Sequence, residues 1–468
     1  MSAKRTTTGL LLIATVVAML AGAPKASAQL FDFPATFAGD LWSRPRLTGD
    51  WFGLRDEMAK RGVLLDVDLL LTPQGVMTGG RDTGDEFWGN SFYTLSVDTQ
   101  KAGLWPGGFL KVEGLSGFGS NVFKDSGATV PVNTAALLPK PDDQTSALMN
   151  ATFIQFLSRQ FGLLGGKIST VDTGGEFAGH YRTQFQNTGL VFPMALDLVP
   201  LSAYGGGVIG LPWENVILTA LVLDPSGTPT NSDISEAFKD GFLVLGTAQV
   251  TIKPFGLVGH QNLYYTWSDK QRLSLTQDPA NLARALLTEK FPKLGNPGPI
   301  LERILERFFP QLLVPVQPAN KESTTWAMSY GFDQYLWQPA GDPKRGIGVF
   351  FTFGASDGNP NPIKYSYNMG IGGNGVVPGR PNDNFGIGWA RSQFSGDFVP
   401  LLRQKLGLGL DVENAVEFYY NASITPWLNV TADLQVVDSA LNKTLNSNNQ
   451  LVNMGTAVVG GLRMYVRF

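Results

Sequence analysis

Hydrophobic and polar residues alternate with a period of two in many segments of the chain. In 411–425, one parity is mostly hydrophobic, whereas the other carries Glu413, Glu417 and Tyr419. The same alternation recurs in 65–72, 110–113, 262–267, 430–436 and 462–468. Successive side chains of a strand point to opposite faces of its sheet, so this period predicts strands with one hydrophobic and one polar face.

The connections between these segments are of two kinds. Short connections rich in glycine, proline and asparagine are predicted at 105–108, 162–166, 211–215, 254–259, 339–346, 378–384 and 426–429. Longer polar stretches lie at 79–90, 120–148, 170–203, 224–241, 268–322, 356–364, 396–410 and 438–452. The two kinds alternate along the chain, and fifteen connections join sixteen strands.

Short turns at one end and long loops at the other are typical of barrels that cross the bacterial outer membrane. Trp105, Trp213, Trp337 and Trp427 all lie at short connections, where an amphipathic indole suits the boundary between hydrocarbon and headgroups. A soluble sandwich is the alternative, but so many regular alternations are less expected there. The sequence predicts an all-β transmembrane fold, a 16-stranded antiparallel outer-membrane β-barrel with hydrophobic residues facing lipid.

The amino terminus carries an export signal. A basic start and an apolar run precede the sequence Ala26-Ser27-Ala28, which is typical of a cleavage site, so residues 1–28 are predicted to be a signal peptide. Residues 29–62 are predicted to form an N-terminal segment with a short periplasmic helix between Trp51 and Arg61, and 63–468 the barrel.

One long loop is predicted to contain a helical insertion. In 268–322, the residues Leu301, Ile304 and Leu305 begin a hydrophobic stripe with helical spacing, opposite charged residues. Between two strands on the side of the long loops, such a helix is expected to pack over the mouth of the barrel.

Composition excludes several classes of function. The chain has no cysteine, so it has neither disulfides nor thiolate metal sites. Its 36 basic and 39 acidic residues nearly balance, which gives no indication of nucleic-acid binding. Its histidines are His180 and His260, and neither forms a convincing Ser/His pair or metal site with its neighbours. We expect no catalytic residues, no metal and no cofactor.

Three blocks of sequence occur in a characteristic order. LTGDWFGLR at 47–55 precedes the first predicted strand, RPNDNFGIGWAR follows at 380–391, and EFYY at 417–420 is followed by ITPWL at 424–428. Together they resemble the carbohydrate-selective porins of Gram-negative outer membranes, the OprB-like family. The resemblance covers both ends of the barrel and implies passive diffusion of sugars, especially glucose-like monosaccharides. The chain departs from the family pattern at Phe52, where glycine is usual, and after 433–435, where a proline-containing end is usual.

A sugar channel needs weak, repeated binding along a wet path. Sugar hydroxyls that lose water need new partners, which carboxylates and guanidinium groups supply. The residues expected to line the pore and contact sugar are Lys111, Glu113, Glu176, His180, Arg182, Gln184, Arg391, Glu413, Glu417, Tyr419, Asp433 and Arg463. Each charged side chain has an alternative role, which is to pair across strands and brace the wall.

The segment 170–203 is the candidate for an inward-folding constriction, because its second half is too apolar to extend into solvent. Trp88, in the first predicted loop, is a weaker candidate for sugar contact. Arg391 shares the parity of the hydrophobic residues Ile387 and Trp389. We therefore expect either a bulge near Ala390 or a position near the outer interface, because an arginine facing lipid at mid-bilayer is costly.

The predicted function is facilitated passive diffusion of carbohydrates into the periplasm. The alternatives are a general or ion-selective diffusion porin, and a lipid hydrolase built on a barrel. The expected partners are small neutral sugars, outer-membrane lipid and the barrel-assembly machinery, which would recognise the terminal Phe468. No nucleic acid is expected, and the chain is expected to be a monomer or a homotrimer.

Overall fold

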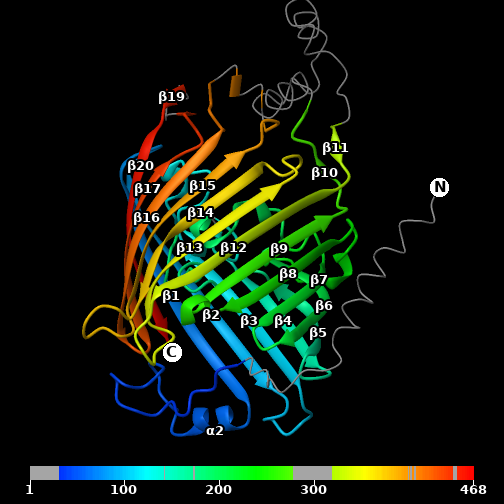
Figure 1. Ribbon diagram of the computed structural model, residues 1–468. Coiled ribbons are helices and arrows are strands. Elements are labelled where there is room, and N and C mark those ends of the chain that lie inside the picture. Colours follow the sequence, from blue (N-terminus) through cyan, green and yellow to red (C-terminus); the bar gives the residue numbers. More distant parts are fainter. Residues whose placement is uncertain are drawn as a thin grey trace, which may run out of the picture.

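The computed structural model describes residues 31–468 except 142, 172–173, 278–318, 399, 401–402, 405–406 and 446–450. Sixteen antiparallel strands form a closed barrel, as predicted (Figure 1). They are β1 Val63–Gly80, β2 Gly84–Asp98, β3 Gly108–Gly119, β4 Ser146–Phe156, β5 Phe161–Ser169, β6 Ser202–Trp213, β7 Val216–Leu223, β8 Leu243–Ile252, β9 Gly259–Ser268, β12 Thr325–Trp337, β13 Gly346–Ser356, β14 Ile363–Asn374, β15 Asn384–Phe394, β16 Val412–Thr425, β17 Leu428–Asp438 and β20 Gly455–Arg467. Two small hairpins extend long loops, β10 Arg272–Leu273 with β11 Lys321–Glu322, and β18 Lys443–Leu445 with β19 Leu451–Asn453.

Each barrel strand pairs with its neighbours along the chain, and β1 pairs with β20 to close the wall. At this seam Asp68 lies opposite Arg467 and Leu70 opposite Tyr465, whereas Leu71 lies opposite Met464. Paired residues of antiparallel strands share a face. The polar terminal residues therefore face the interior and the hydrophobic ones face outward, in agreement with the alternation in the sequence.

Most predicted connections lie close to those observed, but two predictions are wrong. Residues 162–166 belong to β5, whose actual connection to β4 is 157–160. Gly166 has a φ of 130°, and a Cβ there would lie 2.0 Å from the carbonyl oxygen of Ala151. Gly166 therefore allows β5 to lie close to the backbone of β4, and it does not form a turn.

The second wrong prediction is the loop at 79–90. β1 and β2 continue as a long hairpin, so the connection is only 81–83. Trp88 therefore lies in β2, where its side chain is buried and its Nε1 donates to Asn90 Oδ1 at 3.1 Å.

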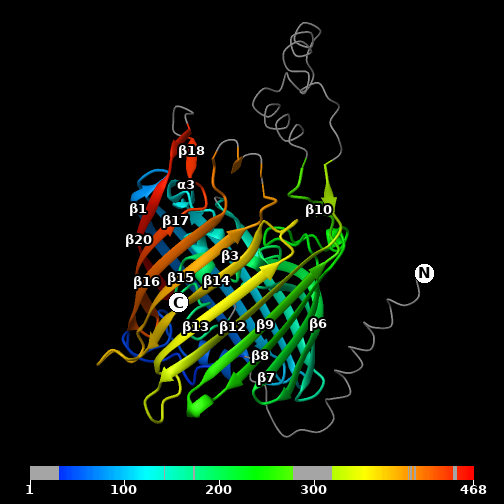
Figure 2. The same ribbon diagram turned by 45° about the horizontal axis from the view of Figure 1, so that its top comes forward.

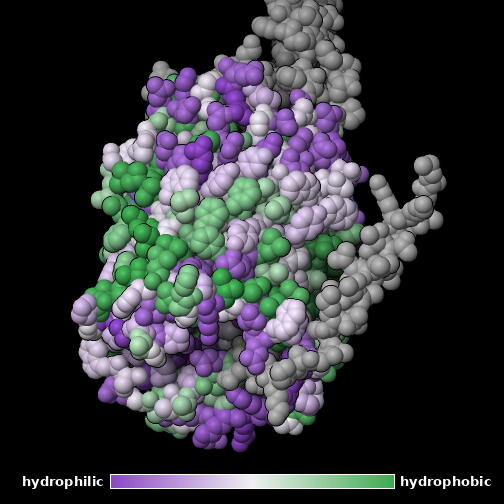
Figure 3. Space-filling view, in the orientation of Figure 1, coloured by the Kyte–Doolittle hydropathy of each residue, from purple (hydrophilic) through white to green (hydrophobic). Residues whose placement is uncertain are grey.

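The outer wall of the barrel carries an apolar band. Hydrophobic residues gather across the middle of the face in Figure 3, over the strands, and hydrophilic residues dominate its upper end. Leu462, Phe418 and Ile387, each on the outward parity of its strand, are about half exposed. Trp213 and Trp337 are the last residues of β6 and β12, at the end of the short turns. No helix in the described part of the chain is both long and apolar enough to cross a membrane.

Two of the long connections fold into the barrel. The inner loop, residues 170–201, contains α4 Thr188–Val191 and the 3-10 helix η2 Met194–Leu196. The second inner loop, residues 120–145, contains α3 Phe123–Ser126 and η1 Thr134–Leu137. Figures 1 and 2 show these cyan and teal segments within the ring of strands. The other short 3-10 helices are η3 Ile234–Glu236 and η4 Pro254–Gly256.

The N-terminal segment lies below the barrel, at the end of the short turns (Figure 1). Its helix α2 spans Leu54–Lys60, within the predicted range. Arg55 anchors it, because Nη2 contacts Asp66 Oδ1 of β1 at 2.6 Å. Phe52 has a φ of 60°, in the left-handed region that favours glycine, and its side chain is fully exposed. The predicted signal peptide and the predicted helical stripe of 301–312 lie outside the described residues.

Candidate functional site: the lumen and its inner loops

Strands β16 and β20 hold the inner loop by buried charges. Glu417 accepts hydrogen bonds from the backbone N–H groups of Gln186 at 2.6 Å and Asn187 at 2.8 Å. Arg463 donates to the carbonyl oxygens of Tyr181 at 2.7 Å and Gln184 at 2.6 Å. Loop backbone has no strand partner of its own, so side chains from the wall must satisfy it once it is buried. These charges therefore fix the loop across the lumen.

The second inner loop is held in the same way. Glu413 accepts from the backbone N–H groups of Thr129 and Val130, both at 2.7 Å. Gln435 Nε2 donates both to Val132 O, at 2.8 Å, and to Asp433 Oδ1, at 2.9 Å. The polar faces of β16 and β17 thus bind loop backbone more than they line a path for water.

Aromatic packing reinforces this contact. The ring of Phe185 meets Tyr419 edge to face at a centroid distance of 4.7 Å and lies 5.4 Å from Phe350. All three side chains are buried in the largest hydrophobic cluster of the described residues, which also includes Leu190 of the inner loop. The loop is therefore packed against β13 and β16 as a part of the folded structure.

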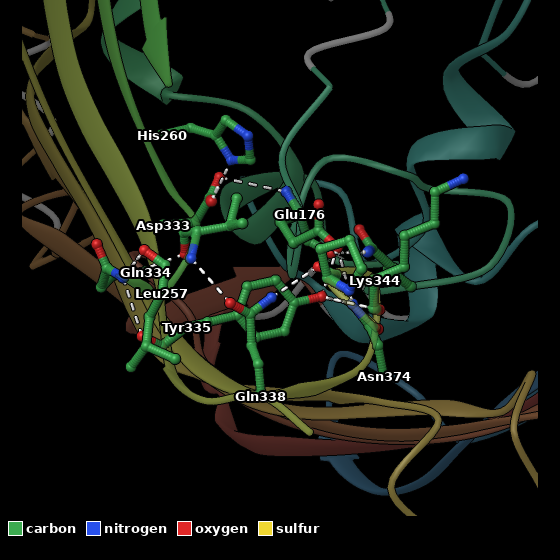
Figure 4. A network of polar contacts seen from close by, with 12 residues as sticks. Glu176, Leu257, His260, Asp333, Gln334, Tyr335, Gln338, Lys344 and Asn374 are labelled. Carbon is green, nitrogen blue, oxygen red and sulfur yellow. Dashed lines mark hydrogen bonds and ion pairs between the residues drawn. The ribbon is translucent and has the colours of Figure 1, made fainter. Parts of the chain in front are cut away.

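A polar network fixes the beginning of the inner loop on the other side (Figure 4). Glu176 Oε1 accepts from Tyr335 Oη at 2.7 Å and from Asn374 Nδ2 at 3.2 Å. Asp333 contacts His260 Nδ1 at 2.6 Å and accepts from the backbone N–H of Glu176 at 3.3 Å. Strands β9, β12 and β14 thereby join the same point of the loop.

A cluster of opposite charges lies where the inner loop meets β1 and β3. Lys111 Nζ lies 3.2 Å from Glu113 Oε2, and Arg182 approaches Glu113 at 3.8 Å and Asp68 at 3.9 Å. The Arg182 guanidinium also stacks over the ring of Phe92, 3.8 Å from its centroid. Lys111 and Arg182 keep 38% and 21% of their side-chain surface exposed. The two cations are therefore accessible to solvent, whereas Glu113 and Asp68, the carboxylates beside them, are buried.

A cavity of about 570 Å³ lies between the inner loop and the wall from β8 to β15. The loop contributes apolar side chains, among them Leu190, Val191 and Met194. Polar groups on the cavity lining include Asp197 of the loop, Asn262 and Tyr264 of β9, and Thr352 of β13. The cavity thus combines an apolar surface with several hydrogen-bonding groups, which is typical of small-molecule sites.

Asp197 was not among the residues predicted from the sequence. It is a single carboxylate within an apolar run and is exposed inside the barrel. The protein atoms that enclose the cavity nevertheless reduce the solvation of its carboxyl group, which raises the pKa of this group above the ordinary value. The cavity residues of β9 and β13 were also missed, because uncharged polar residues on a strand carry no distinctive signal.

The structure brings some of the predicted site residues together. Lys111, Glu113 and Arg182 meet in the charged cluster, and His180 is exposed on the inner loop nearby in the chain. Gln184 is buried and braces the loop, because its Nε2 donates to Glu176 O at 2.8 Å.

Other predicted residues lie where they cannot line a water path. Glu413, Glu417, Tyr419, Asp433 and Arg463 point inward but are buried. The inner loops contact Glu413, Glu417, Tyr419 and Arg463, whereas Asp433 accepts from Gln435 of its own strand. The two glutamates and the arginine each bind backbone of a distant loop. Arg463 also donates to Thr431 Oγ1 of the neighbouring strand β17 at 3.2 Å.

Arg391 is not a pore-lining residue. The register of β15 shows no bulge near Ala390, and Ala390 is the residue that faces inward. Arg391 lies on the outer face, three residues before the end of β15 on the side of the long loops, and Nη1 donates to Asn414 Oδ1 at 3.4 Å. The expected bulge is therefore absent, and a position near the outer interface remains the prediction for Arg391.

The described residues contain no group of three or more histidine, cysteine, aspartate or glutamate side chains that could hold a metal ion.

Comparisons with known proteins identify one relative by sequence and others by structure. Porin B of Pseudomonas aeruginosa is 28% identical over 110 residues, which cover 21% of this chain and 24% of that protein. This chain thus spans about a quarter of that relative. The high-pH structure of Pseudomonas putida OprB has a TM-score of 0.72 and 19% identity, over 91% of this chain and 99% of that chain. The low-pH structure covers the same shares with a TM-score of 0.53 and 15% identity.

At these identities the solved structures establish a shared fold. A family model described as the carbohydrate-selective porin, OprB family, matches residues 88–468. Because this match covers most of the chain, the protein belongs to the OprB family of carbohydrate-selective porins.

Proposed function

We propose that the protein is an outer-membrane channel for passive diffusion of small neutral carbohydrates, including glucose-like monosaccharides, into the periplasm. The observation that carries the proposal is the inner loop, which crosses the lumen and leaves the cations Lys111 and Arg182 accessible, each beside a buried carboxylate. Ammonium and guanidinium groups donate hydrogen bonds that replace the water lost by sugar hydroxyls in a narrow passage.

The mixed charges favour a path for neutral solutes over one for ions. At the charged cluster, Lys111 and Arg182 lie within 4 Å of carboxylates, so their fields largely cancel. A channel for anions would leave cations unpaired along the lumen. Family membership supports the same choice of solute.

Swelling of liposomes that contain the protein tests the proposal. Glucose is expected to enter faster than an uncharged non-sugar of equal size, such as a small amide. The variant Arg182→Gln, which removes a charged donor from the path, is expected to reduce this ratio by about 2–10-fold. Lys239→Gln, on an exposed loop, is the matched control and should leave the ratio unchanged.

Equal rates for glucose and the non-sugar in the wild-type protein would leave a general diffusion porin as the correct description. Planar-bilayer recordings separate the remaining alternative. A strong cation or anion preference in a salt gradient would indicate an ion-selective porin.

A further inference from the structure

Asp197 presents a carboxylate to the cavity from a rigid part of the inner loop. Two residues before it, Ala195 donates its N–H to Ser366 Oγ at 3.1 Å and accepts from Asn361 Nδ2 at 2.8 Å. Three residues after it, Pro200 O accepts from Thr170 Oγ1 at 2.6 Å. The position of Asp197 is therefore fixed from both sides.

The carboxylate of Asp197 forms no hydrogen bond or ion pair with any residue that the structure describes. Asp333, a second carboxylate on the cavity lining, differs in this respect because His260 and the backbone of Glu176 occupy it. The side chain of Asp197 is exposed to the cavity, where water can solvate it. A solute that displaces this water must supply hydrogen-bond donors in its place, and sugar hydroxyl groups are such donors.

We propose that the cavity is a second carbohydrate-binding subsite, in which Asp197 accepts hydrogen bonds from sugar hydroxyls and disfavours anionic sugars. The inference rests on the proposed function and specifies its site and selectivity. Neutral sugars and cationic amino sugars are expected to enter this subsite, whereas uronic acids are repelled.

The surroundings of Asp197 suit a pyranose ring. The amide of Asn262 and the hydroxyl groups of Tyr264 and Thr352 offer both donors and acceptors to hydroxyl groups. The half-buried apolar side chains of Phe192 and Leu196 offer a surface for the C–H face of the ring. The volume, about 570 Å³, lies within the usual range of small-molecule sites, roughly 300–1,000 Å³.

Uptake of three labelled sugars into proteoliposomes tests this assignment: glucose, glucosamine and glucuronate at one ionic strength. In the wild-type protein, glucosamine is expected to enter faster than glucuronate. Asp197→Asn removes the charge at nearly constant size and should reduce that ratio about fivefold, as expected for one charge acting across a few ångströms of a confined pore. Asp197→Glu keeps the charge and should retain most of the ratio.

Two further variants separate charge from hydrogen bonding and from general surface effects. Tyr264→Phe removes a neutral hydroxyl group and is expected to slow all three sugars without changing the ratio. Glu236→Gln, on an exposed loop, removes a carboxylate outside the cavity. It should change neither the uptake rates of the three sugars nor the ratio of glucosamine to glucuronate uptake.

The inference is overturned if Asp197→Asn leaves the ratio of glucosamine to glucuronate uptake unchanged. It is also overturned if Glu236→Gln lowers this ratio as much as Asp197→Asn does. Failure of the proposed function has a different signature. In that case the wild-type protein would not favour glucose over the uncharged non-sugar of equal size, whatever its ratio of glucosamine to glucuronate uptake.

Discussion

The carboxylate of Asp383 connects the turn before β15 to strand β16 by hydrogen bonds. Asp383 is the last residue before β15, and it is buried. Its Oδ2 contacts Arg380 Nε at 2.8 Å and accepts from Tyr420 Oη at 2.5 Å, while Oδ1 accepts from the backbone N–H of Ser423 at 2.9 Å. Burial acts to raise the pKa of Asp383, but these three hydrogen bonds together hold the pKa below its ordinary value.

A depressed pKa predicts a stability that depends on pH. The folded state favours the ionised form, so the stabilisation is present above the unfolded pKa of about 4 and is lost as the pH falls through the lower folded value. Asp383→Asn should lower the free energy of unfolding by about 1–3 kcal/mol at pH 7. In urea titrations, the difference between variant and wild type should shrink towards pH 3; a difference that is constant with pH would contradict this account.

At the scale of elements, the inner loop depends on contacts made by distant strands. Glu417 lies 231 residues from Gln186, whose backbone N–H it binds. Few local interactions hold such a loop, since its helices α4 and η2 span only four and three residues. Its order therefore depends on the charges and aromatic rings of β13, β16 and β20.

Glu417→Gln tests this dependence. The amide keeps one acceptor but turns an N–H₂ group towards the second backbone N–H, which leaves a buried donor without a partner. Local opening should become easier by about 1–3 kcal/mol, so hydrogen exchange at Gln186 and Asn187 should accelerate about 5–150-fold. Glu214→Gln, in an exposed turn, is the control. Unchanged protection in Glu417→Gln would show that packing alone holds the loop.

At the scale of the whole molecule, the outward-facing residues of the barrel change in polarity along the direction of the strands. Trp389 lies opposite Val416, which in turn lies opposite Val436, so this row is apolar across three strands. The next outward row towards the long loops contains Arg391, Asn414 and Asp438. Because the outward side chains change from apolar to polar and charged between these two rows, we predict that the outer boundary of the hydrocarbon lies between them.

Two substitutions on the outward face of β15 test this boundary. Arg391→Leu should change the free energy of folding into lipid by no more than about 1 kcal/mol, because interfacial positions tolerate either residue. Ile387→Arg, two outward positions deeper, should destabilise the barrel by about 2–4 kcal/mol. Urea titration in phospholipid vesicles measures the change in the free energy of unfolding for each variant. Equal changes for the two variants would mean that the hydrocarbon boundary does not lie between these positions.

The strands could be predicted because their signals are local. Side chains alternate along any extended segment, and glycine, proline and asparagine mark turns wherever they occur. The errors arose where one residue type serves two purposes. Gly166 permits close contact between strands, and the polar stretch after Gly80 continues a hairpin instead of forming a loop.

The site could be predicted only in part. Alternation correctly placed Glu413, Glu417 and Arg463 on the inner face, because parity depends only on the strand itself. Whether an inward side chain meets water or loop backbone depends on how residues hundreds of positions apart pack together, and no local pattern encodes that. For the same reason Asp197 passed unnoticed in its apolar run, although the folded chain places it on a cavity.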